Sequence, residues 1–161
     1  MIVLLARWKI FTTGDTGKQG ITEAADRRGT QITERTIRRR ALADRISFTE
    51  HRGKQILLLD FSHATAVQMI PLLTLVRNTV AQHKPKSVLA LANYEGAEID
   101  HDVAMKIKEV LTLDRPFIKK SAWIGTEHIP KALMENFHFF SQRETVTFKT
   151  REEALDWLVK E

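Results

Sequence analysis

Apolar residues recur in this chain with two periods, and the two periods alternate along the sequence. The run at 55–61 (QILLLDF) is almost continuously apolar, which is typical of a strand covered on both faces. The residues that follow place their apolar side chains three or four positions apart, as one face of a helix does. This order of strand and helix repeats to the end of the chain and predicts an α/β domain.

The other strands follow from the same pattern. An alternating strand near 46–50 precedes 55–61, and Arg52 with Gly53 supplies a hairpin turn between them. Three further strands are expected at 87–92 (SVLALA), 117–124 (FIKKSAWI) and 144–149 (ETVTFK), the last of them at an edge of the sheet. With four helices between and after these strands, the pattern predicts a mixed, mostly parallel sheet of four to five strands.

Two signals compete for the start of the helix after 55–61. Thr65 and Gln68 have the spacing of a capping box, whereas Pro71 is best tolerated in a first turn. A proline deeper inside the helix would cost about 3 kcal/mol through a lost hydrogen bond and a steric clash. We therefore expect a polar turn at 62–68 and a helix that begins at Pro71.

Capping residues mark the starts of the other three helices. They are Asp100, Thr126 and Thr150, and each precedes a run whose apolar residues lie three or four apart. Glu153 stands three residues after Thr150 and completes a capping box. These positions predict a helix after each of the last three strands.

The N-terminal part differs from the rest in charge. Residues 1–44 hold nine Lys/Arg and five Asp/Glu, whereas residues 45–161 hold sixteen and fifteen, so most of the net charge of +5 belongs to the first part. Its glycines and its lack of a sustained period predict a basic, partly flexible arm over 1–44. A short helix is expected within it at 33–43, capped by Thr33. The folded domain is expected over 45–161.

The arm offers two candidate contacts with anions. Arg38, Arg39 and Arg40 could meet nucleic acid or an anionic membrane, although a solvated helix face also explains them. Gly17 and Lys18 partly match a phosphate-binding loop, but Gln19 stands where a Ser or Thr would hold magnesium. We expect no nucleotide site there.

Composition limits the function classes further. The chain has no cysteine, which removes disulfides, thiolate metal sites and cysteine nucleophiles. The opening MIVLLA is too short for a signal peptide and far below the roughly 20 apolar residues of a membrane span. We expect a soluble, cytoplasmic protein.

No arrangement of residues amounts to a recognisable catalytic or metal site. The six histidines never occur three or four residues apart, and no serine lies in a G-x-S-x-G motif. Glu95, Glu98, Asp100 and Asp102 could pair as acid and base, but helix capping and solvation explain them without catalysis. We expect no enzyme, no cofactor and no metal.

Lys119 and Lys120 are the least ordinary residues of the core strands. Alternation sends one of them to each face of the sheet, and a cation at the carboxyl edge could bind an anionic ligand. A lysine that extends its stem along the sheet toward water is the simpler interpretation. Trp123 and Trp157 are expected to be packing residues.

Two segments carry a resemblance to a known family. Residues 115–125 (RPFIKKSAWIG) and 147–158 (TFKTREEALDWL) resemble signatures of bacterial STAS-like or SpoIIAA-like proteins, and the chain is similar more broadly to the STAS domain of anti-sigma-factor antagonists and sulphate transporters. The resemblance covers 45–161 and implies a STAS-like fold, with Lys119 at the position of a family lysine. It leaves 1–44 unexplained.

The antagonists carry a phosphorylatable serine after an aspartate at the start of the helix that follows the central strand. In this chain that position falls near Gln68 and Met69, which have no hydroxyl group. Ser62 and Thr65 lie in the same loop, but capping and turn formation explain them better than phosphorylation does.

The hypothesis from the sequence is a non-enzymatic, regulatory STAS-like domain that binds a protein partner or a small anionic or lipidic ligand. The expected surface lies at the turns after the strands, because parallel strands present their loops together at one edge. It comprises Ser62, Thr65, Gln68, Asn93, Tyr94 and Lys119. Nucleic-acid or membrane association through Arg38, Arg39 and Arg40 is the alternative, and a homodimer is compatible with either.

Overall fold

The computed structural model describes the backbone of residues 19–161 and the side chains of residues 29–161. The chain divides into two compact units, Met1–Ile37 and Arg38–Glu161. The phosphate-loop candidate at Gly17 and Lys18 and the apolar run at the N-terminus lie outside the described residues. Among the described residues, no helix combines the length and the hydropathy needed to cross a bilayer.

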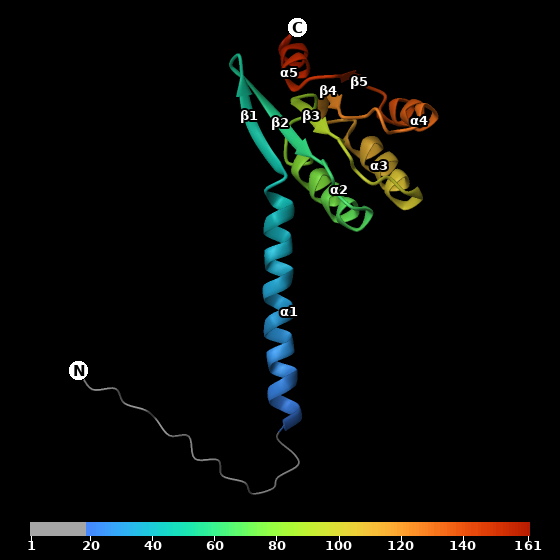
Figure 1. Ribbon diagram of the computed structural model, residues 1–161. Helices are drawn as coiled ribbons and strands as arrows, with labels where there is room; N and C mark the ends of the chain where they lie inside the picture. The colour runs from blue at the N-terminus through green and yellow to red at the C-terminus, as the bar shows by residue number, and fades with distance from the viewer. Residues whose placement is uncertain (1–18) are drawn as a thin grey trace, which may run out of the picture. The chain divides into compact units, whose positions relative to one another are not determined.

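The predicted short helix at 33–43 is part of a longer one, α1 (Gln19–Ala43) (Figure 1). The expected cap, Thr33, lies in the helix interior, where its hydroxyl donates to the Gly29 carbonyl at 3.0 Å. A threonine hydroxyl can make this bond to the preceding turn without breaking a helix. The side chains described in α1 are exposed, apart from the half-buried Leu42.

The sheet of the second unit has five strands in the order β1-β2-β3-β4-β5. They are β1 (Ile46–His51), β2 (Lys54–Asp60), β3 (Val88–Asn93), β4 (Ile118–Ile124) and β5 (Glu144–Phe148). β1 pairs with β2 antiparallel as a hairpin, and every other pair is parallel. The predicted mixed, mostly parallel sheet is confirmed, with β5 at an edge.

Helices cover both faces of this sheet (Figure 1). They are α2 (Ala66–Val80), α3 (His101–Asp114), α4 (Lys131–Ser141) and α5 (Arg151–Val159). The larger apolar cluster lies between the sheet and α2, α3 and α4, and a smaller one lies on the opposite face under α5. The alternation of side chains along β2 explains the division, because Leu57 and Leu59 join the first cluster and Ile56 and Leu58 the second.

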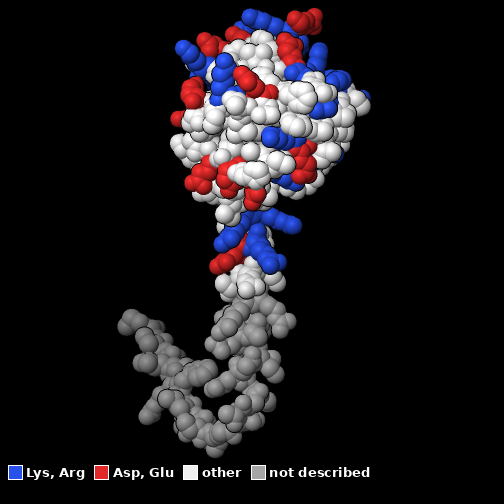
Figure 2. Space-filling model, turned by 90° about the vertical axis from the view of Figure 1, so that its right-hand side faces the viewer, with Lys and Arg blue, Asp and Glu red and all other residues white. Residues whose placement is uncertain are grey.

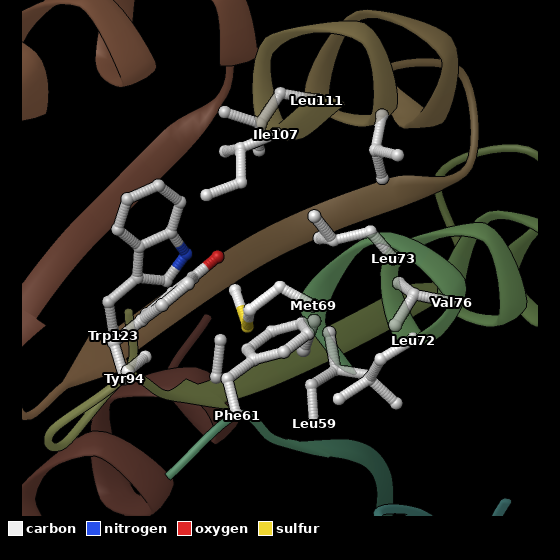
Figure 3. Close-up of a cluster of buried hydrophobic side chains, with 14 of the residues drawn as sticks. Leu59, Phe61, Met69, Leu72, Leu73, Val76, Tyr94, Ile107, Leu111 and Trp123 are labelled. Carbon is white, nitrogen blue, oxygen red and sulfur yellow. The ribbon is translucent and has the colours of Figure 1, made fainter. Parts of the chain in front are cut away.

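Aromatic side chains fill the centre of the larger cluster (Figure 3). The Tyr94 ring stacks on Phe61 at 4.9 Å and lies 5.2 Å from the Trp123 ring. Trp123 is only 1% exposed and is the packing residue that its strand predicted. Burial of three such rings supplies much of the apolar area that stabilises the sheet against α2 and α3.

The prediction that α2 begins at Pro71 is wrong. The helix begins at Ala66, and the Thr65 backbone N–H donates to Gln68 Oε1 at 3.0 Å, as a capping box requires. Pro71 lies on the exposed side of the helix. Val67, four residues earlier and one turn away, is also exposed. Water can solvate the Val67 carbonyl that loses its usual donor, so the proline penalises the helix less than it would in a core.

The predicted caps of the last three helices had different outcomes. Asp100 Oδ1 accepts from Val103 N at 2.8 Å, and the Thr150 hydroxyl accepts from Glu153 N at 3.3 Å, as expected. Thr126 does not cap α4, which begins at Lys131 after Pro130. Residues 126–129 form a separate turn instead, closed by Ile129 N to the Thr126 carbonyl at 3.0 Å.

Candidate functional site

The parallel strands give the sheet two chemically different ends. At the carboxyl edge, β2, β3 and β4 end and their connections lead into helices, and at the amino edge these strands begin. Four of the predicted site residues lie at the carboxyl edge, and we call these four, Ser62, Thr65, Gln68 and Asn93, the carboxyl-edge surface.

Hydrogen bonds between neighbouring connections hold this surface in place. His63 N donates to the Glu95 carbonyl at 2.7 Å, and Glu98 N donates to the Ala64 carbonyl at 2.9 Å. The Ser62 hydroxyl and backbone N–H both donate to Asp60 Oδ1. Because backbone groups carry most of these bonds, the surface is largely preformed.

Gly125 explains how closely these connections approach one another. Its φ is +66°, and a Cβ at this position would lie 2.5 Å from the backbone nitrogen of Glu95. A real side chain does not reach that separation, so only glycine lets the β4 end pass the β3 connection. A neighbouring backbone hydrogen bond, from Tyr94 N to the Ile124 carbonyl at 2.9 Å, also joins the ends of β3 and β4.

Acidic side chains of the chain itself already occupy two of the helix N-termini at this edge, those of α2 and α3. Glu98 Oε2 accepts from Ala66 N at 2.9 Å at the start of α2, and Asp100 caps α3. A phosphate on Thr65 would lie near the Glu98 carboxylate, which is like charge. A phosphate on Ser62 would meet the Asp60 carboxylate as well as the Arg45 guanidinium, which donates to the Ser62 carbonyl at 2.8 Å. The geometry therefore favours the capping and turn roles of Ser62 and Thr65.

The connections that follow β2, β3 and β4 are acidic. Taken with the last residue of each strand (60–65, 93–100 and 124–130), they contain no Lys or Arg, whereas the fourth connection, from β5 to α5, contains Lys149. The first three connections contain five exposed acids: Asp60, Glu95, Glu98, Asp100 and Glu127. Arg45, just before β1, donates to the Asp60 and Ser62 carbonyls at 3.2 and 2.8 Å. A group of Asp and Glu side chains is visible at the lower end of the domain in Figure 2, toward which the β2 arrow points in Figure 1. Among the described residues, no cluster of His, Asp and Glu could hold a metal ion.

Two residues predicted for this surface lie elsewhere. Tyr94 is 4% exposed in the aromatic core, and burial raises the pKa of its hydroxyl. Tyr94 directly follows β3, but its ring turns inward to Phe61. Lys119 is exposed at the amino edge. It is the second residue of β4, and this strand begins at the edge opposite the strand-to-helix connections.

A buried ion cluster was missed by the sequence patterns. Asp114 is 1% exposed, and its Oδ1 lies 3.7 Å from Arg77 Nε. Burial raises the pKa of Asp114 to about 6, against the opposing charges of Arg143 and Arg77, and burial lowers the pKa of Arg143 to about 10. Neither Asp114 Oδ1 nor Arg143 Nε has a hydrogen-bond partner among the described residues. Asp114 is the last residue of α3 and Arg143 follows α4. Charge is usual at helix ends, so no local pattern distinguished them.

Arg38, Arg39 and Arg40 are exposed in the last turns of α1. Figure 2 shows basic side chains on more than one side of this segment. Three consecutive helical residues point about 100° apart, so they cannot all contact one flat surface. Their exposure fits either a solvated helix end or contact with a flexible polyanion.

Comparison with known proteins supports the fold. No protein-family model and no curated protein matches the chain. A solved structure from Shewanella loihica PV-4, described as an uncharacterized protein of the DUF3478 family with a SpoIIAA-like fold, matches with a TM-score of 0.54 and 18% identity. The match covers 70% of this chain and 91% of that one. The chain therefore has a SpoIIAA-like, STAS-like fold, which confirms the resemblance at the level of the fold.

Proposed function

We propose that this STAS-like domain is a non-enzymatic binding module whose carboxyl edge receives a basic segment of a regulatory protein partner. The observation that carries the proposal is the set of five exposed acids on three connections that hold no Lys or Arg. A surface on which acids outnumber the nearby cations, here Arg45 beside Asp60, attracts a partner of the opposite sign and speeds its association.

The preformed connections at the carboxyl edge favour a protein partner over a small anion there. Backbone bonds such as His63 N to the Glu95 carbonyl fix the loops before binding, so less conformational entropy is lost on association. An anion would have to displace Glu98 from the start of α2 and would meet the other acids. The anionic-ligand part of the original hypothesis is therefore not assigned to this edge.

The same bonds argue against an acid-base pair in the loop after β3. Glu98 and Asp100 both accept hydrogen bonds from helix N–H groups, so each carboxylate already has a structural role at the start of a helix. Turnover by the wild-type chain that is lost in Glu98→Gln and Asp100→Asn would contradict the non-enzymatic proposal.

Charge reversal tests the acidic surface directly. Glu95 and Glu127 suit the test, because neither carboxylate holds a hydrogen bond or ion pair within residues 29–161. The Glu95→Lys/Glu127→Lys variant is compared with a matched control, Glu50→Lys/Glu144→Lys, which reverses two exposed charges in β1 and β5 that hold no hydrogen bond or ion pair through their carboxylates within residues 29–161. The full chain of the wild type and of each variant serves as bait in a pull-down from cell extract at physiological salt.

The expected result is a protein captured by the wild type and the control but lost, by about tenfold or more, in the Glu95/Glu127 variant. Binding of that protein, once purified, should weaken as salt rises. Equal capture by all three baits, or equal loss in the control, would contradict a partner at the carboxyl edge.

A second candidate function rests on the exposed arginines at the end of α1. Association of Arg38, Arg39 and Arg40 with nucleic acid or an anionic membrane would depend steeply on salt. Replacing all three by Gln should reduce the slope of log affinity against log salt by about 2 on single-stranded nucleic acid. An unchanged slope on nucleic acid, and unchanged binding to anionic vesicles, would exclude this role.

A further inference from the structure

A cleft of about 460 Å³ opens at the amino edge, where β2, β3 and β4 begin. Four separate parts of the chain form it: the β1–β2 hairpin, the connection from α2 to β3, the start of β4 and the end of α5. This volume is typical of sites for small molecules. The cleft lies at the edge opposite the carboxyl-edge surface, so it is independent of the function proposed above.

Basic side chains dominate the lining, which includes no Asp or Glu. They are Lys54, Lys86, Lys119, Lys120, Lys160 and His83. Like charges gathered around one concave surface repel each other, and the field between them is strongest inside the cleft. A multivalent anion bound there would relieve that repulsion.

Three of these lysines are held by backbone carbonyls. Lys54 Nζ donates to the Val159 carbonyl at 2.9 Å, Lys120 Nζ to the Lys160 carbonyl at 2.7 Å, and Lys86 Nζ to the Arg115 carbonyl at 3.1 Å. Each ammonium group has three donors, so each retains capacity for a further acceptor, and Lys54 Nζ also lies 3.7 Å from Glu161 Oε1. These bonds position three ammonium groups around the cleft in advance.

Lys119 reaches the cleft because β4 is irregular at this residue. Val88 pairs with Ile118 and Leu89 pairs with Lys120, which leaves Lys119 as the extra residue of a bulge. A bulge redirects a side chain out of the regular alternation of a strand. Among the described residues, the side chains of Lys119 and Lys160 make no hydrogen bond or ion pair, and the charge of Lys160 acts on the exposed Asp156 carboxylate without such a contact. Both ammonium groups are therefore available to a ligand.

The cleft also has an apolar side. The Phe48 ring is 44% exposed and lies 5.4 Å from the His83 ring, and the buried Leu57 and Val88 contribute to the same lining. An exposed ring beside a group of cations suits a ligand that combines an apolar ring with negative charge.

We infer that this lysine cleft binds a small phosphate monoester attached to an aromatic ring, with the phosphate on Lys119 and Lys160 and the ring against Phe48. A phosphate monoester carries nearly two negative charges at neutral pH and three acceptor oxygens, so it can bridge ammonium groups that come from different elements. A single carboxylate has neither the charge nor the number of acceptors to use them all.

Calorimetric titration of the full chain with 1-naphthyl phosphate tests the inference. The Lys119→Gln/Lys160→Gln variant removes the two available ammonium groups and leaves the three that hold carbonyls. It should bind about tenfold more weakly or worse. The matched control, Lys131→Gln/Lys149→Gln, removes two exposed lysines outside the cleft and should keep the wild-type affinity. Equal affinity for all three chains, or an equal loss in the control, would overturn the site.

The ring contact has its own test. Phe48→Ala should weaken binding of 1-naphthyl phosphate severalfold and leave binding of inorganic phosphate unchanged, because only the first ligand reaches the apolar side. Equal effects on both ligands, or none on either, would overturn the assignment of the ring.

The same phosphate chemistry occurs in a lipid headgroup, so the last experiment measures binding to vesicles. Phosphatidylcholine vesicles that contain phosphatidic acid present the monoester at a surface, and the N-terminal arm is unchanged in every variant. Binding that depends on Lys119 and Lys160 and is confined to vesicles would assign the site to a lipid headgroup. Binding confined to 1-naphthyl phosphate would assign it to a free molecule. No Lys119/Lys160-dependent binding of either probe would overturn the proposal.

Discussion

The connections at the two edges of the sheet run in opposite directions, from strand to helix at the carboxyl edge and from helix to strand at the amino edge, and side chains of opposite charge satisfy the helix ends there. At the carboxyl edge, acids such as Glu98 and Asp100 accept from the first N–H groups of α2 and α3. At the amino edge, Lys54 donates to the carbonyl of Val159, the last residue of α5, and Lys120 to the carbonyl of its C-cap, Lys160. A parallel arrangement places helix N-termini at one edge and C-termini at the other, and each end attracts the charge opposite to its own dipole.

The difference shows which charges remain for a partner. Some acids and lysines satisfy helix ends, whereas Glu95, Glu127, Lys119 and Lys160 have no such role among the described residues. The two edges would therefore select different partners. A basic protein segment suits the carboxyl edge, and a small anion suits the cleft at the amino edge.

The largest expected contrast is between two glycines with positive φ, one at each edge. Gly125→Ala should destabilise the domain by about 4 kcal/mol. The new Cβ would overlap the Glu95 backbone, and the alanine backbone would be strained at a positive φ. Gly53→Ala, in the β1–β2 hairpin, should cost only about 1 kcal/mol, since no atom lies within 4 Å of its Cβ position. Urea unfolding of both variants measures the contrast, and similar losses would show that the carboxyl edge is not tightly locked.

The next effect concerns the buried Asp114 near the amino edge. Its pKa of about 6 lies above the usual value near 4 for an unfolded chain, so the folded state keeps this proton longer. The stability from this group is fully present below about pH 4 and is lost as the pH rises through about 6, by up to about 3 kcal/mol.

Asp114→Asn cannot lose a proton, so its free energy of unfolding should fall less between pH 4.0 and 7.5, by roughly that amount. Comparing the pH dependence, rather than stability at one pH, separates this effect from the lost attraction to Arg77 and Arg143. Asp44→Asn, at an exposed carboxyl, serves as the control. A wild-type pH profile in Asp114→Asn would contradict the raised pKa.

A smaller effect is expected where lysines satisfy the end of α5. The Lys54→Met/Lys120→Met variant keeps most of the apolar stems but leaves the Val159 and Lys160 carbonyls without these donors. Loss of two such bonds at a partly exposed helix end should cost about 1 to 2 kcal/mol in thermal or urea unfolding. The Lys119→Gln/Lys160→Gln variant should lose almost no stability. If both variants lose the same amount, the division between structural and available lysines is wrong.

The smallest effect should come from Glu98 at the start of α2. Glu98→Ala removes one exposed acceptor from a helix N-terminus and should cost about 0.5 to 1 kcal/mol. The same change should let sulfate stabilise the domain more than it stabilises the wild type, because an anion can then approach Ala66 N. Unfolding midpoints at matched ionic strength in sulfate and chloride measure this, and an unchanged sulfate effect would show that Glu98 does not block an anion site.

Local sequence patterns predicted most of the fold, and their errors have specific causes. The apolar run in β2 and the caps Asp100 and Thr150 were identified correctly, because each depends on neighbours within a few residues. Pro71 was given too much weight against the capping box at Thr65, since the exposure that moderates its cost depends on which face of α2 meets the sheet.

The candidate sites were harder to predict than the fold. Lys119 was recognised as unusual, but it was placed at the wrong edge. The position of each cleft lysine in its element was a usable signal, because Lys54, Lys86 and Lys119 lie at or beside the starts of three strands. The bulge that exposes Lys119 and the inward turn of the Tyr94 ring left no such signal.

The sequence by itself determined the order of strands and helices and the charge at each turn, because these depend on residues that are close together in the chain. Only the tertiary structure decided which charges are available to a partner. Glu98 is engaged by a helix 32 residues away and Lys54 by a carbonyl 105 residues away, whereas Lys119 is left without either. Such contacts exist only after the sheet brings distant segments to one edge, so no local pattern can encode them.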